Sequence, residues 1–208
     1  MSENKKQATA VLASGNAGKI KEIHAILAEY QVDLRSQDHW AIESVEETGS
    51  TFVENALLKA RHASRETGLP AMADDSGLVV EALGGAPGVI SARFAGENAT
   101  DQDNIQAVLT ALKQQGVAES PAAFVCVIVT LRTADDPLPG IYQGIWPGKV
   151  VTEISGAGGF GYDPIFIDSQ SGVSAAELSP VDKNQRSHRG QALAQFKQAV
   201  QSDPFWAV

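Results

Sequence analysis

The feature that most constrains the fold is an apolar run that passes through a glycine-rich turn directly into a helical pattern. Residues 8–13 resemble a buried strand, and Ser14 to Lys19 read SGNAGK. Isoleucine, leucine and tyrosine side chains then recur at helical spacing, which predicts an amphipathic helix over 17–30. The N-terminus of a helix after such a turn presents backbone N–H groups to which a phosphate can bind.

The turn is nevertheless not a P-loop. That pattern needs an earlier glycine and a serine or threonine directly after Gly-Lys, whereas Ala13 and Ile20 occupy those positions. Gly15 and Gly18 still let the backbone approach a ligand closely. Lys19 lies in the first helical turn, where the helix dipole disfavours a cation, and this suggests an anion nearby. The alternative is a solvated lysine beside glycines that serve only the turn.

The remaining chain alternates between helices and strands. Thr51 and Glu54 form a capping box and Gly68 supplies a C-terminal stop, which together predict a helix over 52–67. Strands alternating with helices, together with one hairpin, are typical of an α/β protein with a mixed sheet. Similar patterns predict helices over 101–115 and 187–201 and paired strands over 124–131 and 140–146.

Composition and charge narrow the classes of function. Of the 208 residues, 43% are hydrophobic and 20% are charged, which is ordinary for a globular protein. The formal net charge of −9 disfavours a nucleic-acid-binding surface, which is usually basic. A nucleotide is still compatible with this charge, because local cations and Mg²⁺ can neutralise a small anion.

The longest apolar run, residues 122–131, is too short to span a bilayer. The single Cys126 lies within it, and we expect an inert buried thiol. The N-terminus has no apolar segment typical of a signal peptide. We therefore expect a cytoplasmic protein that binds neither a membrane nor nucleic acid.

Two adjacent carboxylates interrupt an otherwise apolar stretch. Residues 70–83 read as two strands separated by a break at 74–77. Burying Asp74 and Asp75 costs free energy unless they meet a cation. Successive strand side chains point to opposite faces, so one carboxylate can face a site while the other holds the backbone. Ser76 can donate to a phosphate, and the alternative is an Asx-turn in solvent.

A second acidic pair, Glu46 and Glu47, precedes the helix predicted over 52–67. Mg²⁺ is typically held by one or two carboxylates together with substrate phosphates and water. Glu47 and Asp75 would supply such a pair. From its place in the helix we expect Lys59 to bind substrate and, with Lys19 and Lys183, to offset the negative charge that develops in the reaction. Taken alone, two glutamates in a loop are more often a solvated surface feature.

The C-terminal part carries aromatic and basic side chains near glycines. Phe160 and Tyr162 lie in GGFGYDPIF, and aromatic faces of this kind can sandwich a flat base, although core packing is the alternative. Four basic side chains lie before or at the start of the last predicted helix, where clustered cations suit an anion or a carbonyl: Lys183, Arg186, His188 and Arg189. A basic surface turn is the alternative interpretation.

These motifs follow one another from about Ala8 to Phe196, and together they resemble the inosine triphosphate pyrophosphatases, a family that acts on non-standard purine nucleotides. Several motifs in register are far more specific than any one of them. The resemblance is carried by SGNAGK, EETGSTFVENALLKA, ADDSGL with LGGAPGVISARFAG, GGFGYDPIF, and SHRGQAL.

The resemblance implies an elongated α/β fold with a long mixed sheet, two lobes and a central cleft. Residues 1–208 would form a single domain, with 1–7 and 202–208 as tails. It also implies a homodimer that uses Mg²⁺ to hydrolyse ITP, dITP and XTP to the monophosphate and pyrophosphate.

Matched positions assign roles to individual residues. The resemblance makes Glu47 and Asp75 metal ligands and Asp75 the proton acceptor. The implied substrate contacts are Ser14, Gly15, Asn16, Ala17, Gly18, Lys19, Ser76, Phe160, Gly161, Tyr162, Asp163, Lys183, His188 and Arg189.

Two departures and two rival functions accompany this interpretation. Ser14 stands where a threonine is common, which is neutral because both supply a hydroxyl, and the apolar tail SDPFWAV has no counterpart.

A module that binds purine nucleotides without turnover is one rival, but its carboxylates would oppose a polyanion unless they held a metal. A Maf-type pyrophosphatase acting on modified pyrimidine nucleotides is the other, and FGYD and SHRG speak against it.

Overall fold

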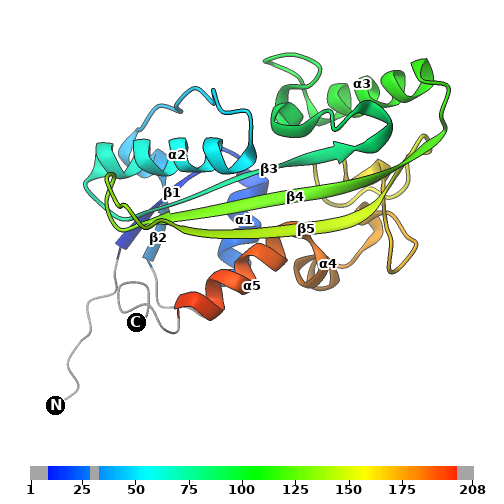
Figure 1. Ribbon diagram of the computed structural model, residues 1–208. Coiled ribbons are helices and arrows are strands. Elements are labelled where there is room, and N and C mark those ends of the chain that lie inside the picture. The colour runs from blue at the N-terminus through cyan, green and yellow to red at the C-terminus, as the bar shows by residue number, and fades with distance from the viewer. Residues whose placement is uncertain (1–8, 29–32, 201–208) are drawn as a thin grey trace. The chain divides into compact units, whose positions relative to one another are not determined.

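A computed structural model describes residues 9–28 and 33–200, so the predicted tails at 1–7 and 202–208 lie outside the described residues. Its strands form one six-stranded sheet in the order β2-β1-β3-β4-β5-β6. β1 pairs in parallel with β2 and β3, whereas β5 and β6 are antiparallel, which confirms the mixed α/β fold (Figure 1). The strands are β1 (Thr9–Ala13), β2 (Asp33–Ser36), β3 (Ala71–Val80), β4 (Glu119–Leu131), β5 (Gly140–Val151) and β6 (Phe166–Asp168).

The chain divides into two compact units. Unit 1 comprises residues 1–75, 127–143 and 191–208, and unit 2 comprises residues 76–126 and 144–190. β3, β4 and β5 each contribute residues to both units. The expectation of a single domain with a cleft stays a prediction.

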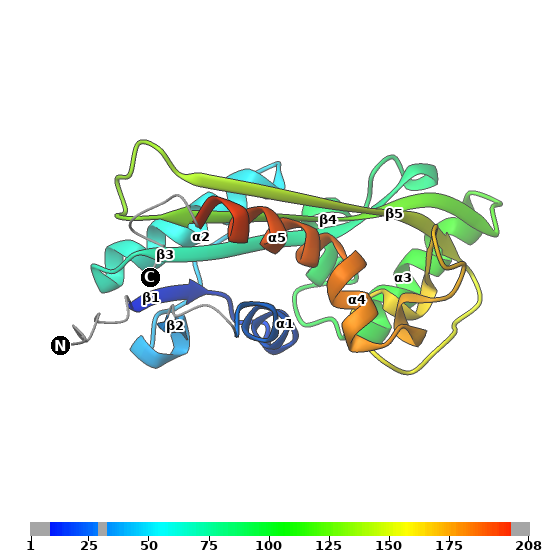
Figure 2. The ribbon, with the colours of Figure 1, turned by 90° about the horizontal axis from the view of Figure 1, so that it is seen from below.

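Unit 1 is organised around α2 (Phe52–Thr67). The predicted capping box of Thr51 and Glu54 is present, and Gly68 ends the helix with a φ of 67°, so this helix is confirmed at both ends. α2 covers one face of the unit 1 strands and the unit 1 part of α5 (His188–Val200) covers the other (Figure 2). Small side chains let α2 lie close to the sheet; its Ala56, Ala60 and Ala63 pack with Val11, Ala13, Ala71, Ala73, Val127, Val129 and Leu131.

The other helices of unit 1 are α1 (Ala17–Leu27) and the short η1 (Gln37–Trp40). α1 confirms most of the helix predicted over 17–30, and the predicted end falls on residues 29–32, outside the described part.

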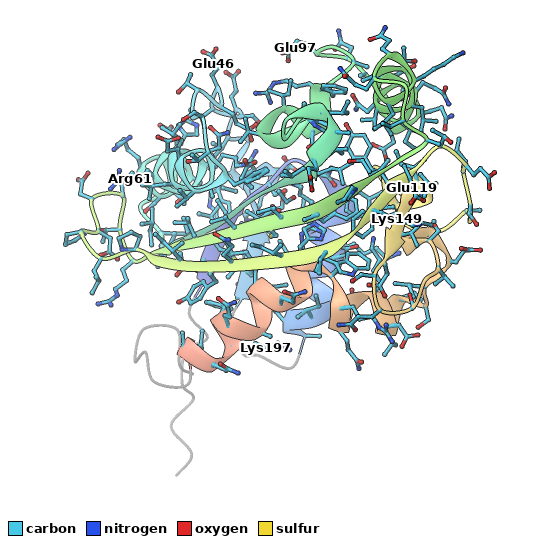
Figure 3. All side chains as sticks on the ribbon, turned by 45° about the vertical axis from the view of Figure 1, so that its right-hand side comes forward. Glu46, Arg61, Glu97, Glu119, Lys149 and Lys197 are labelled. Carbon is cyan, nitrogen blue, oxygen red and sulfur yellow. The ribbon has the colours of Figure 1, made fainter. Side chains whose placement is uncertain are left out.

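Unit 2 surrounds a separate core. α3 (Asp101–Gln114) begins with Thr100 as its cap. Exposed Lys149 of β5 pairs with exposed Glu119 of β4 at 2.7 Å (Figure 3). The short helices are η2 (Glu81–Leu83), η3 (Gly88–Arg93), η4 (Asp163–Ile165), η5 (Ala175–Glu177) and α4 (Pro180–Arg186). The buried core residues are Leu78, Val80, Ile105, Val108, Leu112, Phe124, Trp146, Val150, Tyr162, Ile165, Phe166 and Ala175.

The predicted break at 74–77 is wrong, because β3 runs without interruption from Ala71 to Val80. A break was expected because buried carboxylates are costly. Asp74 and Asp75 instead lie opposite lysine ammonium groups, so they need not turn towards solvent.

Three further boundaries differ from the prediction. β4 and β5 extend beyond the predicted 124–131 and 140–146, and the last helix begins at His188 rather than at residue 187. α4 precedes that helix and was not predicted. Its start is nevertheless marked in the sequence, since the hydroxyl of Ser179 accepts from the Asp182 amide and Pro180 fits the first turn.

Cys126 is fully buried within β4, as expected for a core thiol. No helix in the described ranges has the length and apolar character needed to cross a membrane.

Candidate active site

The SGNAGK segment forms the turn between β1 and α1. Asn16 caps α1, and its side-chain oxygen accepts from the backbone N–H of Lys19 at 3.0 Å. Ser14 is buried, whereas Gly15, Asn16 and Ala17 are exposed. The first turn of α1 carries no acidic side chain. Its backbone N–H groups and partial positive charge are therefore suited to an anion.

Lys19 extends from this turn to β3. Its Nζ lies 3.2 Å from the Oδ2 of Asp74, whose side chain is fully buried. An anion near Lys19 was expected from the unfavourable helix dipole, and the anion within the chain itself is Asp74. Asp74 thereby holds the ammonium of Lys19 against β3.

Asp75, the next residue of β3, points to the opposite face and meets a lysine of α2. Lys59 Nζ donates to Asp75 Oδ1 at 2.8 Å and to Glu47 Oε1 at 2.7 Å. One ammonium group therefore bridges the two carboxylates predicted as metal ligands. α2 supplies the lysine, β3 supplies one carboxylate, and the loop before α2 supplies the other.

Burial and charge oppose each other in this cluster. Burial raises the pKa of Asp75 and outweighs the opposite effect of Lys59 and Lys19. For Lys59, burial alone would lower the pKa, but the negative charges of Asp75, Asp74 and Glu47 raise it. Lys59 thus remains a cation among carboxylates, while Asp75 accepts a proton more readily than an exposed aspartate does.

The cluster has features that fit a divalent metal. The Oδ2 atom of Asp75 is buried and has no hydrogen-bond partner. Two carboxylates with an acceptor left over match the oxygen ligands that Mg²⁺ takes, with phosphates and water completing its shell. Within residues 9–28 and 33–200 no group of three potential metal-binding side chains occurs, so water or substrate oxygens would complete the coordination shell. Glu46 is exposed at the surface and is not part of the cluster (Figure 3).

Unit 2 brings together most of its predicted site residues around Phe160. Lys183 Nζ lies 4.8 Å from the centre of the Phe160 ring and also donates to Asp163 Oδ2 at 2.7 Å. That carboxylate oxygen accepts from the Phe160 amide as well. Gly159 has a φ of 74°, and a Cβ there would overlap the Asp163 carboxylate. Only glycine therefore allows this loop to close on Asp163.

Arg189 lies beside the same ring, with its Cζ 5.8 Å from the Phe160 centre. Its Nη2 donates to the hydroxyl of Ser76 at 3.0 Å, and the side chain is almost fully buried. A phenyl face, an ammonium and a guanidinium thus lie close together. The phenyl face can stack on a flat ring, and the two cations can donate hydrogen bonds to oxygens of that ring.

Three predicted contacts have other surroundings. The Tyr162 hydroxyl donates to the carbonyl of Ser91 within the core of unit 2, and burial raises its pKa well above the usual value. His188 is buried and stacks on Phe124 at 4.9 Å. Gly161 has a φ of 59°, and its amide donates to Asp101 of α3. Their roles as substrate contacts stay predictions.

Sequence reasoning did not assign a role to Asn55, which is fully buried in α2 one turn before Lys59. Its side-chain oxygen accepts from the Gly49 amide at 2.8 Å. The sequence shows only that Asn55 lies beside the apolar stripe of the helix. Polar residues at such positions are usually solvated, so this pattern does not indicate a buried contact.

Comparisons with known proteins agree with the geometry. A dITP/XTP pyrophosphatase of Shigella flexneri is 53% identical over 192 residues, which cover 92% of this chain and 98% of that protein. A dITP/XTP pyrophosphatase of Escherichia coli O157:H7 is 52% identical with the same coverage. A HAM1 protein from Coxiella burnetii has a similar structure, with a TM-score of 0.88, 47% identity, and coverage of 95% of this chain and 100% of that one.

The expected resemblance is therefore confirmed at the level of the family. The Ham1 family model matches residues 10–199, nearly the whole chain, and the chain belongs to the Ham1 family.

Proposed function

We propose that this protein hydrolyses non-standard purine nucleoside triphosphates, namely ITP, dITP and XTP, to the monophosphate and pyrophosphate. The observation that carries the proposal is the Lys59 ammonium held between Glu47 and Asp75. A binding module for polyanions gains nothing from two carboxylates, whereas a hydrolase needs them for metal and proton transfer. The relatives named dITP/XTP pyrophosphatase support this substrate class.

Glu47 and Asp75 would hold Mg²⁺, because both are carboxylates and Asp75 has a buried oxygen without a partner. When bound, the ion polarises phosphate oxygens and neutralises part of the charge that develops on them. Lys59 lies against the same two carboxylates and adds a second positive charge.

The unit 1 residues would act on the triphosphate. Asp75 would accept the proton of the attacking water. Lys19 and the N-terminal amides of α1 bind phosphate oxygens, with Asp74 orienting the lysine. SGNAGK then needs no P-loop hydroxyl, since carboxylates elsewhere hold the metal.

The unit 2 residues would bind the base. Phe160 offers a ring face, Lys183 and Arg189 offer donors, and Asp163 fixes both the loop and the lysine. Ser76 directly follows Asp75 on β3, so one strand carries both a metal ligand and a partner of Arg189.

The products provide the first test. Phosphorus NMR of an ITP digest with Mg²⁺ should show inosine monophosphate and pyrophosphate in equal amounts. Hydrolysis in ¹⁸O-labelled water would in addition place the label on the phosphorus that water attacks. Orthophosphate with a diphosphate would refute the assigned bond, and binding of ITP without any product would favour the non-catalytic module.

We further propose a homodimer located in the cytoplasm, where a triphosphate pool requires such an enzyme, with no affinity for nucleic acid. The dimer rests on the family resemblance and on the apolar residues of SDPFWAV. Light scattering at micromolar concentration should report about twice the chain mass of 21.9 kDa. A mass of a single chain at every concentration tested would contradict the dimer.

A further inference from the structure

The loop that carries Glu47 is attached to α2 by a buried amide. The Oδ1 of Asn55 accepts from the backbone N–H of Gly49, two residues after Glu47, at 2.8 Å. A Cβ at Gly49 would lie 2.7 Å from that oxygen and 2.6 Å from the Cβ of Glu54. The loop thus lies so close to the helix that only glycine fits.

The Gly49 amide also settles the orientation of the Asn55 side chain. The group that accepts from an N–H must be the oxygen, so the other end of the amide is the nitrogen. That nitrogen is buried and has no hydrogen-bond partner. Burying an amide nitrogen without a partner costs free energy, so this side chain is not arranged for stability alone.

A second asparagine, Asn104, occupies the equivalent position in another helix, and its side-chain amide is fully hydrogen-bonded. Asn104 is the fourth residue of α3, as Asn55 is of α2, and each helix starts with a complete capping box. The Oδ1 of Asn104 accepts from the Ala95 amide at 2.9 Å, and its Nδ2 donates to the Ala92 carbonyl at 3.0 Å. Both ends of this amide are used, whereas at Asn55 only the end that holds the Glu47 loop is used.

The placement of Asn55 relative to the carboxylates explains the difference. Lys59 lies one turn further along α2 and donates to Glu47 and Asp75. Asn55 and Lys59 therefore contact the Glu47 loop on the backbone at Gly49 and on the carboxylate, in addition to the contacts of Glu54 with the Ser50 and Thr51 amides and of His62 with the Glu43 carbonyl. Lys59 bonds the carboxylate directly, and among these backbone contacts with α2 the one at Gly49 lies nearest to Glu47 in the chain, so it constrains the Glu47 backbone most closely.

We propose that Asn55 is a positioning residue that holds Glu47 in the geometry required for binding the divalent metal. This inference rests on the proposed role of Glu47 as a metal ligand. Groups that orient metal ligands typically change metal affinity about 10–100-fold when they are removed.

The test measures Mn²⁺ binding to the free enzyme by electron paramagnetic resonance, without nucleotide and well below the melting temperature of each variant. Asn55→Ala should weaken Mn²⁺ binding about tenfold or more. Asn104→Ala is the matched control; it should keep Mn²⁺ affinity within about twofold, although it leaves both an amide and a carbonyl without partners. Equal Mn²⁺ affinity of Asn55→Ala and the parent would overturn the proposal.

A double-mutant cycle tests whether Asn55 acts through Glu47. Glu47→Gln should itself weaken Mn²⁺ binding, and adding Asn55→Ala should then weaken it by no more than about threefold, because the positioned carboxylate is already lost. Full additivity would overturn the proposal while leaving Glu47 as a ligand. Unchanged Mn²⁺ affinity in Glu47→Gln alone would refute the ligand role, and the positioning role with it.

Gly49→Ala approaches the same contact from the loop side, should Asn55→Ala fold poorly. Its new Cβ would push against the Asn55 oxygen and the Glu54 side chain. It should weaken Mn²⁺ binding in the same direction and to a similar extent, and an unchanged Mn²⁺ affinity would count equally against the proposal.

Discussion

Replacement of Asp75 by asparagine should lower kcat for ITP by ~10²-fold or more at saturating Mg²⁺. The substitution keeps the shape of the side chain and an oxygen that can accept from Lys59, but it removes the charge and the proton-accepting group. The loss should fall on kcat, because the residues proposed to bind the base and most of the phosphates are others. Pyrophosphate release over a full Mg²⁺ titration measures it, which separates weak metal binding from slow chemistry.

Asp136→Asn is a suitable control for this change. Asp136 is another buried aspartate of unit 1, and its carboxylate accepts from the amides of Arg132 and Leu138 in the turn between β4 and β5. Its replacement should reduce thermal stability and leave kcat within about twofold, since effects of distant sites are independent. Activity of Asp75→Asn within about threefold of the parent would remove Asp75 from the mechanism.

The parts of the fold that the sequence predicts well are those with local signals. α2 was predicted with correct ends because Thr51, Glu54 and Gly68 mark them within the helix and its caps. The turn from β1 into α1 was also predicted, since apolar run, glycines and helical spacing follow one another directly. α4 was missed although Ser179 and Pro180 mark its start, because a helix so short has little apolar periodicity.

The parts that were missed depend on contacts between distant residues. β3 continues through Asp74 and Asp75 because Lys19 and Lys59 neutralise them, and no local pattern reveals that pairing. The sequence pattern predicts a cation beside these carboxylates and an anion beside Lys19, but it does not indicate that these residues are partners. In the same way, an asparagine beside an apolar stripe does not show that it holds a loop at Gly49.

The aromatic residues illustrate how one loop motif serves two purposes. Phe160 lies against Lys183 and Arg189, whereas Tyr162, two residues later, is buried in the core of unit 2. The sequence predicted both as possible partners of a base and named core packing as the alternative. Positive φ angles at Gly159 and Gly161 place the two rings in different surroundings, and such angles are not encoded in hydrophobic spacing.

The second large effect concerns the choice of base. Arg189 has donors and no acceptor, and it is held by Ser76 beside the Phe160 ring. If it faces the 6-position of the purine, it can donate to the keto oxygen of hypoxanthine or xanthine. The 6-amino group of adenine would present a donor to a donor, which costs about 1–3 kcal/mol for each buried group left unpaired.

Guanine also has a 6-keto oxygen, so its rejection requires a second donor near position 2. Such a donor would bond the oxygen of xanthine, tolerate the hydrogen of hypoxanthine and oppose the amino group of guanine. Sites that depend on unpaired polar groups can discriminate by ~10²-fold or more. We therefore expect kcat/KM for ITP and XTP to exceed that for GTP and ATP by at least about this factor.

Arg189→Ala should narrow the gap between ITP and ATP, mainly by lowering kcat/KM for ITP, because the favourable bond to the keto oxygen is lost. Arg189→Lys keeps a donor and should preserve more of the ITP rate than alanine does, although it lacks the planar fork of arginine. Arg186→Ala is the control for loss of a nearby arginine, since Arg186 donates to Asp168 at 3.3 Å and should leave the ITP to ATP ratio unchanged. Steady-state kinetics with ITP, XTP, GTP and ATP test this prediction. If kcat/KM of the parent for GTP or ATP lies within about tenfold of that for ITP, the base is not selected by hydrogen-bond donors alone.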